Sequence, residues 1–224
     1  MNNSIQHNYL NQDKILNWCL GMRVAEKVLL KTKTMKIKLI TFYLSLITIS
    51  SLAQADIKTK NYEIGDFSRI VTHGGGNLNI SYSDEYTLEV NANKDCFELV
   101  EVSVSSKVLY IEVKNSKTRT CDCTINIGLP ILYELVQNRG GNIVLKKGFR
   151  PTNSFWCKIK GGGNIDISEF SVDSVYASIE GGGNILLNAK KKLDGKIGGG
   201  GLIEYLGDPI VKSNVSGGGT IRKQ

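Results

Sequence analysis

Apolar and polar residues alternate in short runs that follow glycine-rich segments in the part of the chain after residue 56. Leu78 and Ile80 flank one polar residue, and Ile165 and Ile167 flank another. A period of two residues is typical of a β-strand with one buried face. A second apolar run precedes each of the later glycine segments. Each repeat therefore predicts a strand, a turn that contains the glycines, and a second strand. No stretch after residue 56 has clear helical periodicity.

The glycines are clustered at nearly regular intervals. Of the 24 glycines, 18 lie in six blocks. The blocks are Gly74–Gly76, Gly140–Gly141, Gly161–Gly163, Gly181–Gly183, Gly198–Gly201 and Gly217–Gly219. The apolar residues two positions after each block are 65, 22, 20, 18 and 18 residues apart. An internal period near 20 residues is typical of a solenoid.

The repeat predicts an all-β fold, a right-handed parallel β-helix or solenoid-like coil with about 20 residues per repeat. Stacking would place isoleucines of successive rungs over one another, with glycine corners that tolerate positive φ. The asparagines after four of the blocks would form a hydrogen-bonded column. They are Asn77, Asn142, Asn164 and Asn184. Leu202 and Thr220 replace asparagine in the later rungs, where the column should end.

Residues 56–224 are expected to form one domain, regular in 136–224 and irregular in 56–135. The irregular half still has alternating runs between turn residues. The strands expected there are Tyr86–Asn91, Phe97–Val104, Val108–Lys114 and Thr124–Leu129. This half either forms wider coils of the same solenoid or a small β-sandwich packed on its end.

Residues 35–55 have the form of a secretory signal peptide. Lys36 and Lys38 precede 14 uncharged, mostly apolar residues, and Ala53-Gln54-Ala55 offers small residues at a cleavage site. The apolar run is shorter than the roughly 20 residues of a membrane span. We therefore expect cleavage after Ala55, with an uncleaved anchor as the alternative. Residues 1–34 are then a mis-called start upstream of Met35, a disordered cytoplasmic tail, or an amphipathic helix around Ile15–Leu30.

The excess of positive charge belongs mainly to the leader. The chain has 28 basic and 21 acidic residues, a net charge of +7. Residues 56–224 retain 21 basic and 19 acidic residues, a net charge of +2. This balance gives no support for nucleic-acid binding. The one basic run, Lys190-Lys191-Lys192, is expected to be a solvated turn.

Four cysteines follow the leader, and export would permit disulfides. Cys121 and Cys123 are too close in sequence for an easy mutual bridge. We expect Cys96 and Cys157 each to bond one of them, although four cysteines allow three pairings and the thiols could also stay free. A metal site would need more ligands than the sequence offers.

The recurring GGGNI runs, the leader, and the segment Ile-Gly-Leu-Pro-Ile-Leu before Arg139-Gly140-Gly141-Asn142-Ile143 resemble the head GIN domain family. That family is described as auto-transporter adhesins and is named for its Gly-Ile-Asn-rich repeats. The resemblance covers about residues 67–221. It implies an exported, all-β, β-helix-like protein, with no established catalytic residues and no cofactor.

Other chemistry finds little support. No glycine block precedes a helix, as a phosphate-binding loop requires, and only the run from Gly161 supplies the aspartate, Asp166, of a calcium repeat. The carboxylates Asp166, Glu180 and Glu204 are scattered, and we expect them to be solvated rather than catalytic. His73 is expected in a turn or on the surface.

Phe155-Trp156 and Tyr176 could form an aromatic strip for contact with a sugar or protein, the alternative being core or end packing. The sequence thus predicts an exported, non-enzymatic, adhesin-like module without metal or cofactor. It would bind a protein or glycan on a cell surface, from the periplasm, the outer-membrane surface or the extracellular space. A contiguous exposed aromatic patch would favour this hypothesis. The alternatives are a glycan-active β-helix enzyme and a structural or sensing envelope module.

Overall fold

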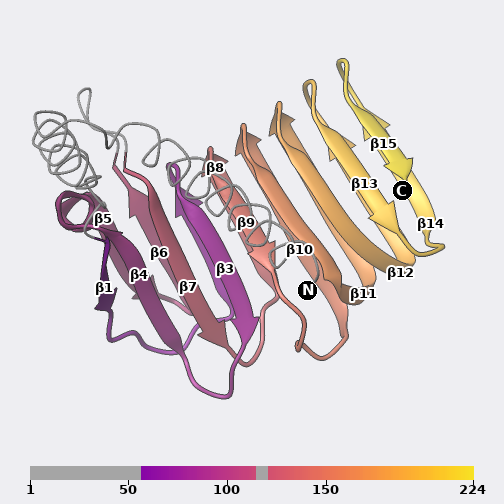
Figure 1. The fold of residues 1–224 in the computed structure, drawn as a ribbon. Coiled ribbons are helices and arrows are strands. Elements are labelled where there is room, and N and C mark those ends of the chain that lie inside the picture. Colours follow the sequence, from indigo (N-terminus) through magenta and orange to yellow (C-terminus); the bar gives the residue numbers. More distant parts are fainter. Residues whose placement is uncertain (1–56, 115–120) are drawn as a thin grey trace, which may run out of the picture. The chain divides into compact units, whose positions relative to one another are not determined.

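The computed structural model describes residues 57–114 and 121–224, which lie in the compact unit Ala55–Gln224. The proposed leader and the extension before it fall outside the described residues. Within these described ranges the fold is all-β with one short 3-10 helix, and the strands form one curled, half-barrel sheet. Figure 1 shows the strands as successive layers from β4 to β15.

The described elements follow one another along the chain. They are β1 (Ile57–Asn61), β2 (Arg69–His73), β3 (Asn77–Tyr82), β4 (Thr87–Asn93), η2 (Lys94–Leu99), β5 (Val100–Ser105), β6 (Val108–Val113), β7 (Cys123–Leu129), β8 (Glu134–Arg139), β9 (Asn142–Leu145), β10 (Thr152–Gly161), β11 (Asn164–Gly181), β12 (Asn184–Ile197), β13 (Leu202–Leu206), β14 (Ile210–Val215) and β15 (Thr220–Lys223).

The strands line up in two columns. The first column contains β1, β4, β7, β3, β9, β13 and β15, and the second contains β5, β6, β2, β8, β10 and β14. The long strands β11 and β12 belong to both, because their first parts pair in the first column and their last parts in the second. A glycine corner leads from the second column to the first in each later repeat.

The predicted stacking of rungs is confirmed by the strand register. Ile165 of β11 pairs with Ile185 of β12, which pairs with Ile203 of β13, and Ile203 pairs with Ile221 of β15. All these pairings are parallel. In the second column Ile159, Ile179 and Ile197 align in the same way and have no exposed surface. One residue of each alternating pair therefore enters a continuous apolar core.

The asparagine column is also present. The Nδ2 atom of Asn142 donates to Oδ1 of Asn77 at 3.1 Å, Asn164 donates to Asn142 at 2.8 Å, and Asn184 donates to Asn164 at 2.8 Å. Leu202 and Thr220 occupy the next two register positions. The side-chain ladder thus stops at Asn184, as the sequence predicts.

One corner lacks the usual glycine. Arg139 occupies the register position of Gly161, and its φ of +78° lies in the left-handed region. That conformation costs a non-glycine residue about 1–2 kcal/mol. The neighbouring Gln137 is buried, and its Nε2 donates to the carbonyl of Gly141 at 2.9 Å. The amide replaces the isoleucine of later rungs and fixes this corner from inside the core.

The irregular half keeps part of the expected coil and adds antiparallel strands. Strands β2, β3, β6 and β7 stack in parallel with the later rungs, whereas β1 with β4, β4 with β7, and β5 with β6 pair antiparallel. They continue the same sheet, so there is no separate sandwich within the described residues. The prediction of one strand over Phe97–Val104 was wrong in part, because Phe97–Leu99 belong to η2. Asn93 caps that turn by accepting from the backbone N–H of Cys96.

The lysine run needs a small correction. Lys190, Lys191 and Lys192 are exposed as expected, but they lie within β12 rather than in a turn. They mark the place where this strand passes from the first column to the second. The Nζ of Lys191 lies 2.6 Å from a carboxylate oxygen of Asp173 on the preceding rung.

The cysteine prediction was half right. Cys96 and Cys121 form a disulfide, whereas Cys123 and Cys157 are separate buried thiols. Cys123 lies on β7 and Cys157 on β10, and strands β3 and β9 lie between β7 and β11, the partner of β10, so the two thiols are on different rungs. Burial raises the pKa of both thiols, that of Cys123 to about 11. Both are therefore protonated near neutral pH.

Candidate functional site

The outer side of the second column carries a group of apolar side chains. Val71 of β2 lies beside Tyr110 of β6 and Val136 of β8. Trp156 of β10 lies diagonally from Val136 and directly beside Tyr176 of β11. We call these five residues the aromatic patch. Trp156 is 46% exposed and Tyr110 is 41% exposed. Diagonal neighbours on a sheet are within reach of aromatic side chains, so the patch is contiguous.

Stacking holds two of the rings in place. The rings of Trp156 and Tyr176 have centroids 5.2 Å apart and planes inclined by 8°. The Nζ atom of Lys192 lies 5.2 Å from the centroid of the Tyr176 ring. Such contacts stabilise aromatic side chains by about 0.5–1.5 kcal/mol at each pair. These contacts hold the two rings in one orientation.

Charged residues border the stacked rings. A shallow groove of about 290 Å³ is lined by Glu134, Trp156, Lys158, Tyr176, Asp194 and Lys196. The Nζ atom of Lys158 lies 2.5 Å from Oε1 of Glu180. The hydrogen bond from Lys158 lowers the pKa of Glu180. Aromatic surface bordered by both signs of charge suits a polar macromolecular partner.

The carboxylates considered for catalysis do not converge. Glu180 lies in the second column, whereas Asp166 and Glu204 lie in the first, with Leu186 between them. Each has a local partner. Asp166 accepts from the backbone N–H and hydroxyl of Ser168, at 2.9 and 2.6 Å. Glu204 accepts two bonds from Arg222, at 2.9 and 2.7 Å.

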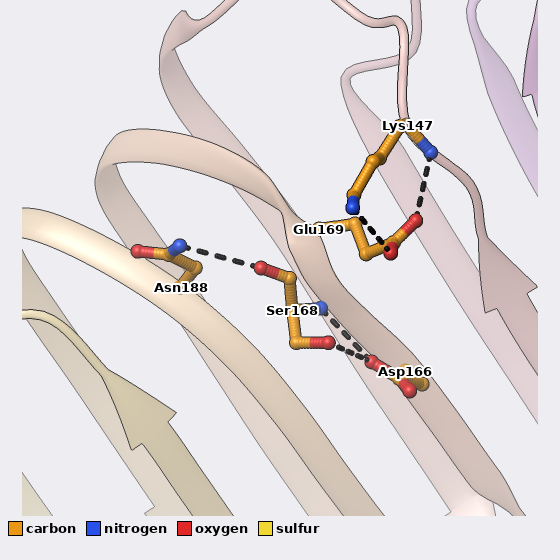
Figure 2. Close-up of polar contacts among 5 residues, drawn as sticks. All are labelled: Lys147, Asp166, Ser168, Glu169 and Asn188. Carbon is orange, nitrogen blue, oxygen red and sulfur yellow. Dashed lines mark hydrogen bonds and ion pairs between the residues drawn. The ribbon is translucent and has the colours of Figure 1, made fainter.

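Asp166 belongs to a polar cluster that shapes the bend in β11. Figure 2 shows Ser168 between Asp166 and Asn188, whose Nδ2 donates to the Ser168 carbonyl at 3.3 Å. Glu169 accepts from the backbone N–H of Lys147 at 3.0 Å and forms an ion pair with its Nζ at 3.5 Å. The register shifts after Ile167, so β11 carries extra residues here relative to β12. The cluster has a structural role.

The extra residues in the bend fill the core. Phe170 is buried and its ring contacts Phe149 and Phe155, with centroids 5.7 and 5.4 Å apart. Phe155 itself has no exposed surface. Of the expected aromatic strip, Trp156 and Tyr176 therefore lie outside and Phe155 belongs to the core.

His73 lies on the outer side of β2, where its Nε2 is 3.1 Å from Nδ2 of Asn138. It is exposed, as expected of a surface residue. Among the described residues, no group of three or more His, Cys, Asp or Glu side chains could hold a metal ion.

The sequence did not predict the other half of the aromatic patch. No regular repeat precedes the strands that carry Val71, Tyr110 and Val136, so the register of these strands could not be read from the sequence. Only the parallel register of β2 with β6 and β8 brings them together. Their alternation with buried neighbours was the only signal in the sequence, and it does not identify neighbouring strands.

A family model and solved structures match this chain. The family model described as "Putative auto-transporter adhesin, head GIN domain" matches residues 66–153 and 151–209. Among solved structures, a putative adhesin from Bacteroides fragilis NCTC 9343 is 19% identical, with a TM-score of 0.52 over 75% of this chain and 97% of that chain. A putative lipid binding protein from Parabacteroides distasonis ATCC 8503 is 18% identical, with a TM-score of 0.39 over 76% and 98%. No curated protein matched the chain.

The likeness to the Bacteroides fragilis structure shows a shared fold.

The part of the chain that the structure describes contains no helix long and apolar enough to cross a membrane.

Proposed function

Because the chain belongs to the head GIN domain family, we propose that it is an exported, non-enzymatic protein that binds a protein or glycan on a cell surface. The aromatic patch is the observation that carries this proposal. Large exposed apolar patches mark interaction sites more often than scattered apolar residues do. Trp and Tyr also supply much contact area at a low cost in side-chain entropy.

Residues 35–55 would act as a signal peptide, cleaved after Ala55, and residues 56–224 would form the mature domain. The Cys96–Cys121 disulfide is consistent with an oxidising compartment. We also propose that the stacked rungs wind as a right-handed parallel β-helix, since crossovers between parallel strands are almost always right-handed. The place of action would be the periplasm, the outer-membrane surface or the extracellular space.

The ion pairs and hydrogen bonds of the candidate acids support a non-enzymatic role. A glycosidase needs one carboxyl group with a raised pKa and a second one about 5–10 Å away across a substrate cleft. Glu180 has its pKa lowered by Lys158, and its candidate partners lie in the other column. The residues of the second column are therefore better suited to contact than to proton transfer.

Replacing Trp156 with alanine is expected to weaken binding to cell-envelope proteins or arrayed glycans at least about tenfold, since central aromatic residues dominate binding energy. Tyr176→Ala should have a similar effect. Val144→Ala is the control, because Val144 is 38% exposed but lies on the first column. Binding would be measured with the purified protein by glycan array and by surface plasmon resonance on envelope extracts. Unchanged binding of both aromatic variants would contradict the proposal.

A further inference from the structure

The two ends of the stacked sheet differ. At the C-terminal end, β14 pairs only with β12 and β15 only with β13, so each has an unpaired edge among the described residues. Val215 is 38% exposed, and Val211 and Ile221 are only partly buried. On the preceding rung, Leu193 and Ile197, which pair with Val211 and Val215, have no exposed surface. The apolar core is therefore open at this end.

Backbone groups also point away from the stack there. The N–H groups of Ser216, Thr220 and Gln224 donate to the preceding rung, at 2.8, 3.0 and 3.0 Å. Successive N–H groups of a strand point to opposite sides. The N–H of Ser213 and its alternate neighbours in β14 therefore face the open edge, ready to pair with another strand.

At the opposite end β1 and β5 also have unpaired edges among the described residues, but the chain itself covers the core there. The 3-10 helix η2 contacts β1, β4 and β5, and Cys96 within it is buried and bonded to Cys121. Strand β5 pairs antiparallel with β6 as a hairpin beside this turn. A second copy cannot add a rung at this end without displacing η2, which excludes continuous head-to-tail stacking.

Charge at the open end permits contact between identical surfaces. The basic residues of the last rung each have an acidic partner. Lys212 lies 3.7 Å from Asp194, Arg222 lies 2.7 Å from Glu204, and Lys223 lies 2.5 Å from Asp208. The six charges balance, so two such ends meet no net repulsion and can exchange ion-pair partners.

We propose that two copies of the chain associate through their C-terminal rungs, with β14 and β15 of each copy pairing with the same rung of the other. A chain that pairs with this end must present two strands that are separated by the thickness of the apolar core, with apolar side chains between them. The last rung of a second copy has that form. Because η2 covers the core at the other end, each copy leaves its core open only at this one, so the contact is isologous and closes as a dimer instead of extending into a filament.

Two variants test the proposal by sedimentation equilibrium of the full chain, together with mass measurement by light scattering. Val215→Lys should raise the dimer dissociation constant at least tenfold, because Val215 aligns with the buried Ile197 and faces the open core. Ile57→Lys is its matched control, because Ile57 is 67% exposed but lies at the closed end, and it should leave the dissociation constant unchanged. Ser213→Pro should also prevent pairing by removing an edge N–H, whereas Ser213→Ala should not.

The expected particle has twice the 24.6 kDa mass of the chain, or twice the processed mass if the leader is removed. A monomer at concentrations of about 100 μM, a dimer indifferent to Val215→Lys, or larger assemblies sensitive to Ile57→Lys would each overturn the proposal. Circular dichroism of each variant separates loss of pairing from loss of folding.

Discussion

Replacing Gly181 with alanine is expected to destabilise the protein by about 2–5 kcal/mol. Gly181 has a φ of +138°, and a Cβ atom added there would lie 2.4 Å from the carbonyl oxygen of Gly161 and 2.9 Å from its Cα. The clash is with the backbone of the preceding rung, which no rotamer change can relieve. The corner can form only by separating the two rungs and losing their hydrogen bonds.

The adjacent Gly182 provides the control. A Cβ atom at Gly182 would meet no atom within 4 Å, and its φ is not in the positive range. Gly182→Ala should therefore change the free energy of unfolding by no more than about 0.5 kcal/mol. Urea titration would compare the midpoints of the two variants at a common m-value. Equal losses of unfolding free energy in the Gly181 and Gly182 variants would show that close contact between rungs is not the reason why glycine occupies the corners.

Truncation of Ile179 to alanine is the second large effect, with an expected loss of about 2–5 kcal/mol. Ile179 has no exposed surface and lies between Ile159 and Ile197 of the neighbouring rungs. Its side chain also packs below the next corner, since a Cβ at Gly201 would lie 2.7 Å from its Cγ2 atom. Stacked neighbours on both sides restrict collapse into the cavity that alanine would leave.

A graded series separates this cavity effect from a general sensitivity of the strand. Ile179→Val should cost about 0.5–1.5 kcal/mol, less than the alanine variant. Val144→Ala, at an exposed position, should cost less than about 0.5 kcal/mol. Thermal and urea unfolding would give the free energies. A loss at Ile179 no greater than that at Val144 would contradict a packed interior between the columns.

The regular half of the fold was predictable because its repeat fixes both the register and the corners. Aligning the glycine blocks pairs Ile165 with Ile185 and Asn164 with Asn184, and the structure has those pairs. Local chemistry supports the same register, since the asparagines bond along the column. The glycine blocks, the isoleucines and the asparagines therefore all predict the same register.

The irregular half was less predictable because it has no repeat from which to read the register. The Ser106-Lys107 turn, with both φ angles positive, turns β5 and β6 into a hairpin although neither residue is a glycine. Antiparallel pairing there depends on a backbone conformation that the residue types do not indicate. The 3-10 turn over Phe97 was missed for a similar reason, because its apolar residues also fit a strand.

The candidate site was only half predictable for a related physical reason. Trp156 and Tyr176 are one repeat apart, so the sequence already places them on neighbouring rungs. Tyr110 and Val136 come from strands that are neighbours only through β2. The patch is a property of the sheet order, which chain order alone does not specify.

The stacked architecture also explains how the patch could be ready for a partner. Its side chains project from neighbouring strands spaced about 4.8 Å apart, and the Trp156–Tyr176 stack follows that spacing. A rigid sheet that holds contact residues in place reduces the entropy lost on binding. The same glycine corners that set the rung spacing thus set the geometry of the outer surface.

In-register stacking of the rungs can be tested most directly with paired cysteines. Asn164 and Asn184 lie side by side in the register, so the Asn164→Cys, Asn184→Cys variant should form a disulfide under mild oxidation. The control pair, Asn164→Cys with Leu186→Cys, is out of register by two residues, and its Cβ atoms should be about 7–8 Å apart. Peptide mass mapping should find the 164–184 bridge and little of the 164–186 bridge. Equal yields of the two bridges, or a bridge only in the control, would contradict the stacked arrangement.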